Sequence, residues 1–170
     1  MDECIEWLSE AREVFPKLNN KIILVEYKTM GSKKLGFVKT KIEQKLDFDH
    51  EALLLGENVK IKKENSKPKE FNIYINQNLQ KIKNIALRKE IIQHILIHEL
   101  LHIENQDLMT LSKEYNRRKK KKIHLNEFEE EIFRRFNQLR RLKGIMEIEK
   151  REHLDIAINR ILTSINWYEK

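Results

Sequence analysis

Cysteine is almost absent from this sequence, with a single residue, Cys4, among 170. An intramolecular disulfide needs two cysteines, so none can form within the chain. Zinc sites built mainly from thiolates need at least two cysteines and are excluded for the same reason. Any zinc ion must therefore be held by histidine and carboxylate side chains.

Long hydrophobic runs are also missing. Residues 91–103, IIQHILIHELLHI, are apolar, but polar residues interrupt them, which predicts a buried helix and not a membrane span. The first residues, MDECIEWLSEAREVF, carry acidic side chains where a signal peptide carries basic ones. We therefore expect a cytoplasmic protein that has no membrane partner.

Positive charge is in excess, with a net charge of +7 and a pI near 9.4. An excess of this size favours polyanionic partners. The densest cluster is the basic run at 117–122, which consists of Arg117, Arg118, Lys119, Lys120, Lys121 and Lys122.

The periodicity of apolar residues predicts both helices and strands in a chain long enough for one domain with a hydrophobic core. The segment at 71–77, FNIYINQ, alternates cleanly and should bury Phe71, Ile73 and Ile75 on one side. The other predicted strands are a hairpin of 21–28 with 35–44 and a pair around Gly56 and Glu57. Helices are expected at 2–18, 86–104, 126–144 and 145–165. This pattern indicates an α+β fold, with a domain at 1–144 and a C-terminal helical extension, 145–170, packed on it.

Residues 98–102 read HELLH and match the HExxH pattern. Positions four apart lie on one face of a helix, so His98 and His102 can bind one metal ion. Glu99 lies about 100° further around the helix axis, from where its carboxylate reaches a metal-bound water. In such sites the metal lowers the pKa of its water, and the glutamate takes the proton as the water attacks a carbonyl.

The alternative is that these histidines are ordinary helix residues, since His94 also lies on this helix. However, the surrounding side chains are nearly all Ile and Leu, where unpaired imidazoles and a carboxylate are costly to bury. A zinc ion bound to His98 and His102 removes that cost. His94 lies one turn before His98 and at a different angle around the helix axis, and we interpret it as a core residue.

A catalytic zinc site needs a third protein ligand. Asp107 follows closely, but the segment HIENQD lacks a glycine that would let the chain turn back sharply. His124 and Glu127 lie at the start of the next helix, and either reaches the metal if the two helices pack together. The residues alone leave this choice open.

The order of helix, strands, HELLH and IHLNEFEEEIFRRF resembles the SprT-like (Spartan-type) zinc metallopeptidases over residues 5–140. The resemblance implies a zincin-like fold, in which a small antiparallel or mixed sheet packs on the HExxH helix. It also implies peptide-bond hydrolysis with Glu99 as general base and Zn²⁺ held by His98, His102 and His124. Leu125 stands where that family usually has glycine, and the segment before His124 is longer than usual.

Small gluzincin-type peptidases are a second resemblance, and they imply a glutamate as third ligand. Glu127 matches best, with Glu130 and Glu131 as weaker options. In zincins generally, the strand before the HExxH helix forms the rim of the cleft, so segment 71–77 is expected to pair with an extended protein or peptide substrate.

The basic run at 117–122 has three interpretations: a solvated loop, a non-specific DNA contact of the kind the SprT-like resemblance implies, or a flap between the two groups of ligands. A different class of function is a DNA-binding module that keeps a structural or vestigial zinc site.

Overall fold

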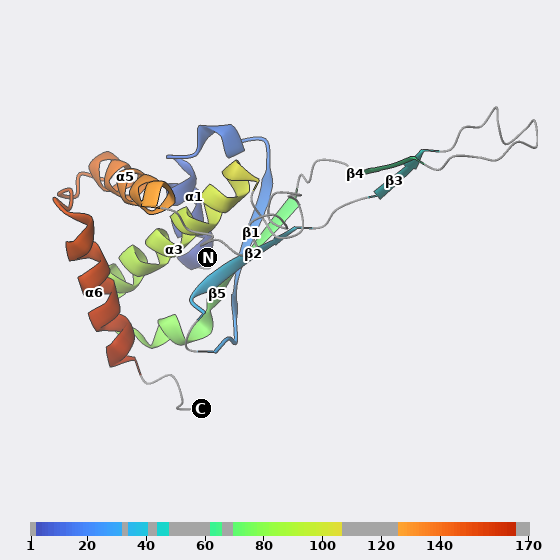
Figure 1. Cartoon of the computed structure of the whole chain (residues 1–170). Helices are drawn as coiled ribbons and strands as arrows, with labels where there is room; N and C mark the ends of the chain where they lie inside the picture. Colours follow the sequence, from blue (N-terminus) through green and yellow to red (C-terminus); the bar gives the residue numbers. More distant parts are fainter. Residues whose placement is uncertain are drawn as a thin grey trace, which may run out of the picture.

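The computed structural model describes residues 3–31, 34–40, 70–106 and 126–165, and the backbone of 44–47 and 62–65. Within these ranges the chain is α+β, as the sequence predicts, with four α-helices and a three-stranded mixed sheet (Figure 1). The helices are α1 (Glu3–Arg12), α3 (Ile85–Asn105), α5 (Asn126–Leu142) and α6 (Arg151–Ser164), with 3₁₀ turns η1 (Pro16–Leu18) and η2 (Gln77–Lys81). The strands are β1 (Ile22–Lys28), β2 (Gly36–Thr40), β3 (Gln44–Asp47), β4 (Lys62–Asn65) and β5 (Glu70–Asn76).

The sheet has the order β1-β5-β2, with β5 parallel to β1 and antiparallel to β2. The predicted hairpin of 21–28 with 35–44 is therefore wrong, because β5 lies between these two strands. The expectation that segment 71–77 pairs with an extended substrate is wrong for the same reason, since β5 has a strand on each side. Its alternation is confirmed, since Phe71, Ile73 and Ile75 are buried and the residues between them are half-buried.

A second, two-stranded ribbon pairs β3 with β4 in antiparallel fashion. A strand pair is expected around Gly56 and Glu57, but both residues lie outside the described residues. The strands that do pair lie further out on either side, at 44–47 and 62–65.

One face of the sheet is covered by α1 and α3, and α5 packs on α3 (Figure 1). The most buried positions of α3 are Ile92, Leu96, Ile97 and Leu100. Because α3 contacts α1, α5 and the sheet, it is apolar on most sides, as the sequence of 91–103 indicates. None of the helices within the described ranges is long and apolar enough to cross a bilayer.

The helix ends follow local capping chemistry. Asn84 Oδ1 accepts a hydrogen bond from the backbone N–H of Leu87 at 3.1 Å and caps α3. Gly144, the predicted end of the third helix, has a φ of +66°. The final helix begins at Arg151 and not at 145, and α1 ends at Arg12, before Pro16. α6 packs on the core through Leu154 and, more loosely, Ile158 and Ile161.

Candidate functional site

Helix α3 brings the two motif histidines face to face. His98 Nε2 and His102 Nε2 are 3.1 Å apart, and both side chains are half-buried. Zinc–nitrogen bonds of about 2.0–2.1 Å at a tetrahedral angle put two ligand nitrogens about 3.3 Å apart. The pair therefore fits two ligands of one ion. The same distance fits a hydrogen bond between two neutral imidazoles, in which one Nε2–H donates to the other Nε2.

Glu99 is turned toward the sheet and is only 7% exposed. Strand β2 leaves room for it at Gly36: a Cβ built there would lie 3.5 Å from Glu99 Oε1 and 2.7 Å from Ile95 Cγ2. A side chain at position 36 would thus collide with α3. Gly36 is a site residue that the sequence analysis does not identify. An isolated glycine in a predicted strand indicates that another group packs closely on the backbone, but it does not reveal which group.

Phe128 of α5 packs against both motif histidines. Its ring centroid lies 4.6 Å from that of His102 and 5.3 Å from that of His98. Phe128 is buried together with Ile132 and Phe136, the stripe that the sequence predicts would pack α5 on α3. The first turn of α5 therefore lies directly beside the histidine pair.

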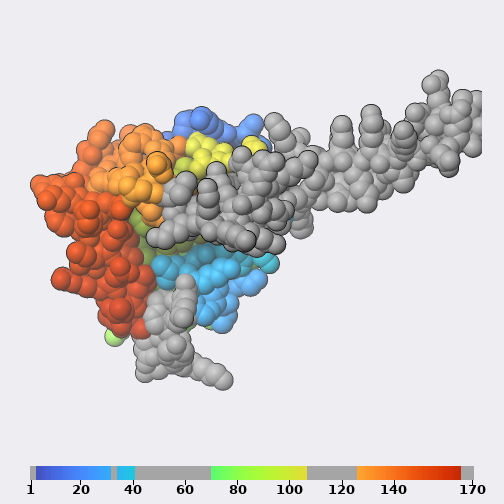
Figure 2. Space-filling model, in the orientation of Figure 1, coloured from blue at the N-terminus to red at the C-terminus, as the bar shows by residue number. Residues whose placement is uncertain are grey.

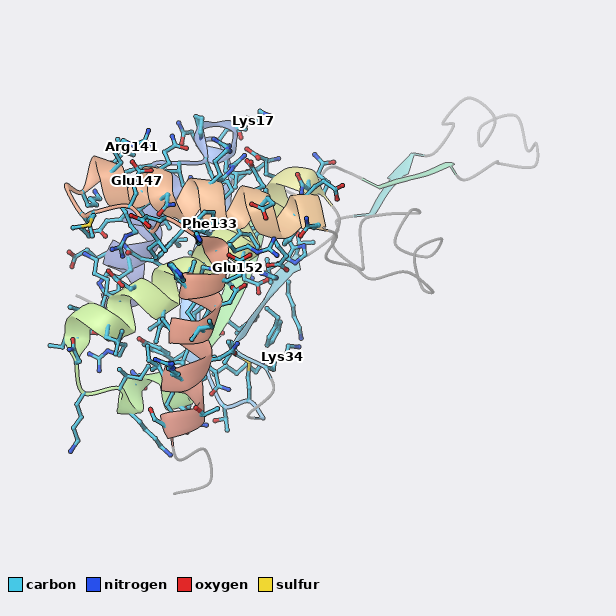
Figure 3. The ribbon with its side chains drawn as sticks, turned by 60° about the vertical axis from the view of Figure 1, so that its left-hand side comes forward. Lys17, Lys34, Phe133, Arg141, Glu147 and Glu152 are labelled. Atoms are coloured by element: carbon cyan, nitrogen blue, oxygen red, sulfur yellow. The ribbon has the colours of Figure 1, made fainter. Side chains whose placement is uncertain are left out.

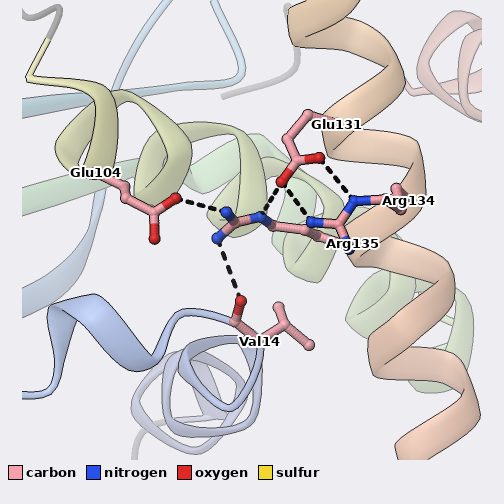
Figure 4. Close-up of polar contacts among 5 residues, drawn as sticks. All are labelled: Val14, Glu104, Glu131, Arg134 and Arg135. Atoms are coloured by element: carbon pink, nitrogen blue, oxygen red, sulfur yellow. Dashed lines mark hydrogen bonds and ion pairs between the residues drawn. The ribbon is translucent and has the colours of Figure 1, made fainter.

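A buried arginine fixes α5 to its neighbours (Figure 4). Arg135 donates to Glu104 of α3, to Glu131 one turn earlier on α5, and to the backbone oxygen of Val14 at 3.2 Å. Its guanidinium also lies 4.2 Å from the ring centroid of Phe15. These contacts join α5, α3 and the segment after α1, so the register of α5 on α3 is closely defined.

The two glutamates considered as weaker ligands are engaged elsewhere. Hydrogen bonds from Arg134, with a further contribution from Arg135, lower the pKa of Glu131 to about 2. Glu130 pairs with Arg151 of α6 at 2.7 Å. Both carboxylates are thus paired with arginines in this arrangement.

Only some of the residues considered as a third ligand lie in the part of the chain that the structure describes. Glu127 is exposed in the first turn of α5. His124, Asp107 and the basic run at 117–122 lie outside the described residues. Within the described ranges, no group of three His, Cys, Asp or Glu side chains is arranged to hold a metal ion.

His94, one turn before His98, has a different environment. Its ring meets Phe136 edge to face, with centroids 5.5 Å apart. Burial lowers the pKa of His94 to about 4, so the imidazole is neutral at neutral pH. This environment agrees with the interpretation of His94 as a core residue.

Comparison with protein-family models, curated proteins and solved structures gives no match. The SprT-like and gluzincin resemblances therefore rest on the motif residues alone.

Proposed function

We propose that this protein is a zinc-dependent metallopeptidase of the zincin type. The observation that supports it best is the approach of His98 Nε2 and His102 Nε2 to 3.1 Å, one turn apart on α3, beside the buried carboxylate of Glu99. The HExxH spacing puts a carboxylate at this position, and a hydrolytic site uses it as the general base.

His98 and His102 would hold the zinc ion, with His124 as third ligand by resemblance. Zinc in such a site acts as a Lewis acid that activates water and polarises a carbonyl. Glu99 serves as general base: burial against β2 holds its carboxylate in one position, ready to accept the proton of the attacking water. Phe128 restricts the two imidazole rings and keeps bulk water from that side of the site.

Strand β2 is the substrate-binding edge in this proposal. Within the described residues β2 pairs only with β5, and the proposal assigns its other edge to an added strand of substrate. Gly36 brings this strand against Glu99. An extended protein or peptide segment pairing with β2 would run past the general base, held mainly by backbone hydrogen bonds that tolerate many sequences.

The role of Glu99 gives the decisive experiment. Glu99→Gln should lower the rate of hydrolysis of an unfolded protein substrate by about 10²-fold or more, since general-base catalysis typically contributes that much. Zinc content should stay unchanged, because the carboxylate handles a proton and not the metal. Glu6→Gln, an exposed carboxylate on α1, is the matched control and should keep full activity.

Hydrolysis by Glu99→Gln at the rate of the parent would refute the assignment of the general base. Loss of zinc together with activity would instead make Glu99 a ligand. DNA-linked substrates, with the basic run as their non-specific DNA contact, remain an implication of the SprT-like resemblance.

A further inference from the structure

The sheet has a second face, turned away from α1 and α3, that carries an aromatic pair. Phe37 of β2 and Tyr74 of β5 are cross-strand neighbours, and their rings stack with centroids 4.7 Å apart and planes 22° from parallel. Both side chains are only half-buried. Their chain neighbours Val38, Ile73 and Ile75 point to the other side, into the core. The ring pair therefore faces outward.

Three lysines from separate segments surround these rings. Lys34 Nζ lies 3.9 Å from the Phe37 centroid, Lys28 Nζ lies 4.6 Å from the Tyr74 centroid, and Lys39 Nζ lies 5.6 Å from the Phe37 centroid. All three lysines are exposed. In the part of the chain that the structure describes, none of them forms an ion pair with a carboxylate, although Glu26 is the register partner of Tyr74 on β1.

The position of Lys34 is fixed by the backbone. Asn76, which is fully buried at the end of β5, donates from Nδ2 to the backbone oxygens of Lys34 at 2.8 Å and Gly31 at 3.2 Å. The N–H of Asn76 also donates to Leu35 O at 2.8 Å. These bonds hold the segment before β2 against the sheet, and Lys34 projects beside the strands (Figure 3).

We propose that this aromatic–lysine face, formed by Phe37, Tyr74, Lys28, Lys34 and Lys39, binds single-stranded nucleic acid. Residues of β1 and β2, light blue and cyan in Figure 2, lie at the surface of the folded body. The rings offer a platform on which bases stack without sequence preference, and the lysines complement the charge of the phosphates.

The chemistry of the face selects this partner over other polyanions. On binding, a base takes the place of an ammonium on the ring, and the flexible lysine turns to a neighbouring phosphate. A duplex keeps its bases stacked within the helix and cannot use the rings in this way. An acidic peptide matches the charge but has no base to stack. The face lies on the opposite side of β2 from Glu99, so the proposal does not rest on a bound zinc ion.

The test is fluorescence anisotropy of a labelled oligothymidylate of about 15 nucleotides, titrated with the full chain in the presence of a chelator. Changing Lys28, Lys34 and Lys39 together to Gln should weaken binding at low salt by about tenfold or more. The slope of log K against log salt concentration should also flatten by about 2, which corresponds to three phosphate contacts.

The matched control changes three exposed lysines elsewhere, Lys17, Lys83 and Lys150, to Gln and removes the same charge. Figure 3 shows that Lys17 is well separated from Lys34. This variant should bind with nearly the affinity of the parent. If the two triple variants lose affinity equally, binding depends only on the net positive charge of the protein and the proposal fails.

The aromatic contribution is tested at Phe37. Phe37→Leu should lose about tenfold in affinity with an unchanged salt slope, whereas Phe37→Tyr keeps a ring and should bind like the parent. Circular dichroism and thermal melting establish that each variant is folded. Equal binding by Phe37→Leu and Phe37→Tyr would overturn the proposal, as would equally strong competition by duplex, polyglutamate or anionic vesicles.

Discussion

Neighbouring side chains of α3 have very different surroundings, and these surroundings decide their chemistry. His98 and His102 face each other and the ring of Phe128, so their Nε2 atoms converge on one point. Glu99 is buried against the backbone of β2 at Gly36. His94 is held neutral by burial next to Phe136. The HExxH spacing predicts the first arrangement, but the partners of Glu99 and His94 come from other elements and are not visible in the motif.

The neutral His94 should make the fold sensitive to acid. Its pKa is about 4 in the folded chain and lies below the ordinary value of 6.5, so the unfolded chain takes up this proton first as the pH falls. The contribution of His94 to the free energy of unfolding is therefore fully present above about pH 6.5 and is lost progressively toward pH 4. At pH 5 the loss is roughly 2 kcal/mol.

Urea unfolding of the zinc-free protein between about pH 7 and pH 5 measures this effect. His94→Gln should have a flatter pH dependence than the parent, while the exposed His153→Gln serves as control and should behave like the parent. Identical pH dependence in the parent and His94→Gln would contradict the buried, neutral assignment.

At the scale of elements, the docking of α5 on α3 organises the site. Phe128 contacts both motif histidines, and Arg135 joins α5 to Glu104 and to the segment after α1. α5 begins at Asn126, two positions after His124 in the sequence, and its first turn lies beside the histidine pair. Glu127, in contrast, is exposed in the first turn. This geometry favours a ligand just before α5 over one within it.

His124→Ala should therefore lower zinc affinity by about tenfold or more, because a three-ligand site loses a direct bond. Glu127→Ala should change the affinity by less than about threefold. Competition with a chromophoric chelator measures both. The reverse order of effects would make Glu127 the ligand and favour the gluzincin resemblance.

The elements also show what local sequence can predict. The alternation in 71–77 and the periodicity of 86–104 depend on which sides of a segment are buried, so β5 and α3 are predicted close to their observed bounds. Strand pairing depends on partners that are distant in sequence. The sequence predicts a hairpin of β1 with β2, which follow each other in the chain, yet β5 lies between them.

At the scale of the whole molecule, one small sheet separates two surfaces with different chemistry. Its inner face meets α3 and brings Gly36 against Glu99, and its outer face carries Phe37, Tyr74 and the three lysines. The outer surface was not predicted, since the residues that form it come together only through the order β1-β5-β2. The HExxH motif, in contrast, is recognisable from the sequence because its positions, 98–102, span little more than one helix turn.

The central claim, that His98 and His102 hold a zinc ion, is tested most directly by elemental analysis of protein purified without chelator. We expect about one zinc ion per chain in the parent and none in His98→Ala or His102→Ala, with a lower melting temperature for the zinc-free parent than for the zinc-bound protein. His153→Ala, an exposed histidine on α6, should keep its zinc. A parent protein that contains no zinc, and takes up none when zinc is added, would contradict the account.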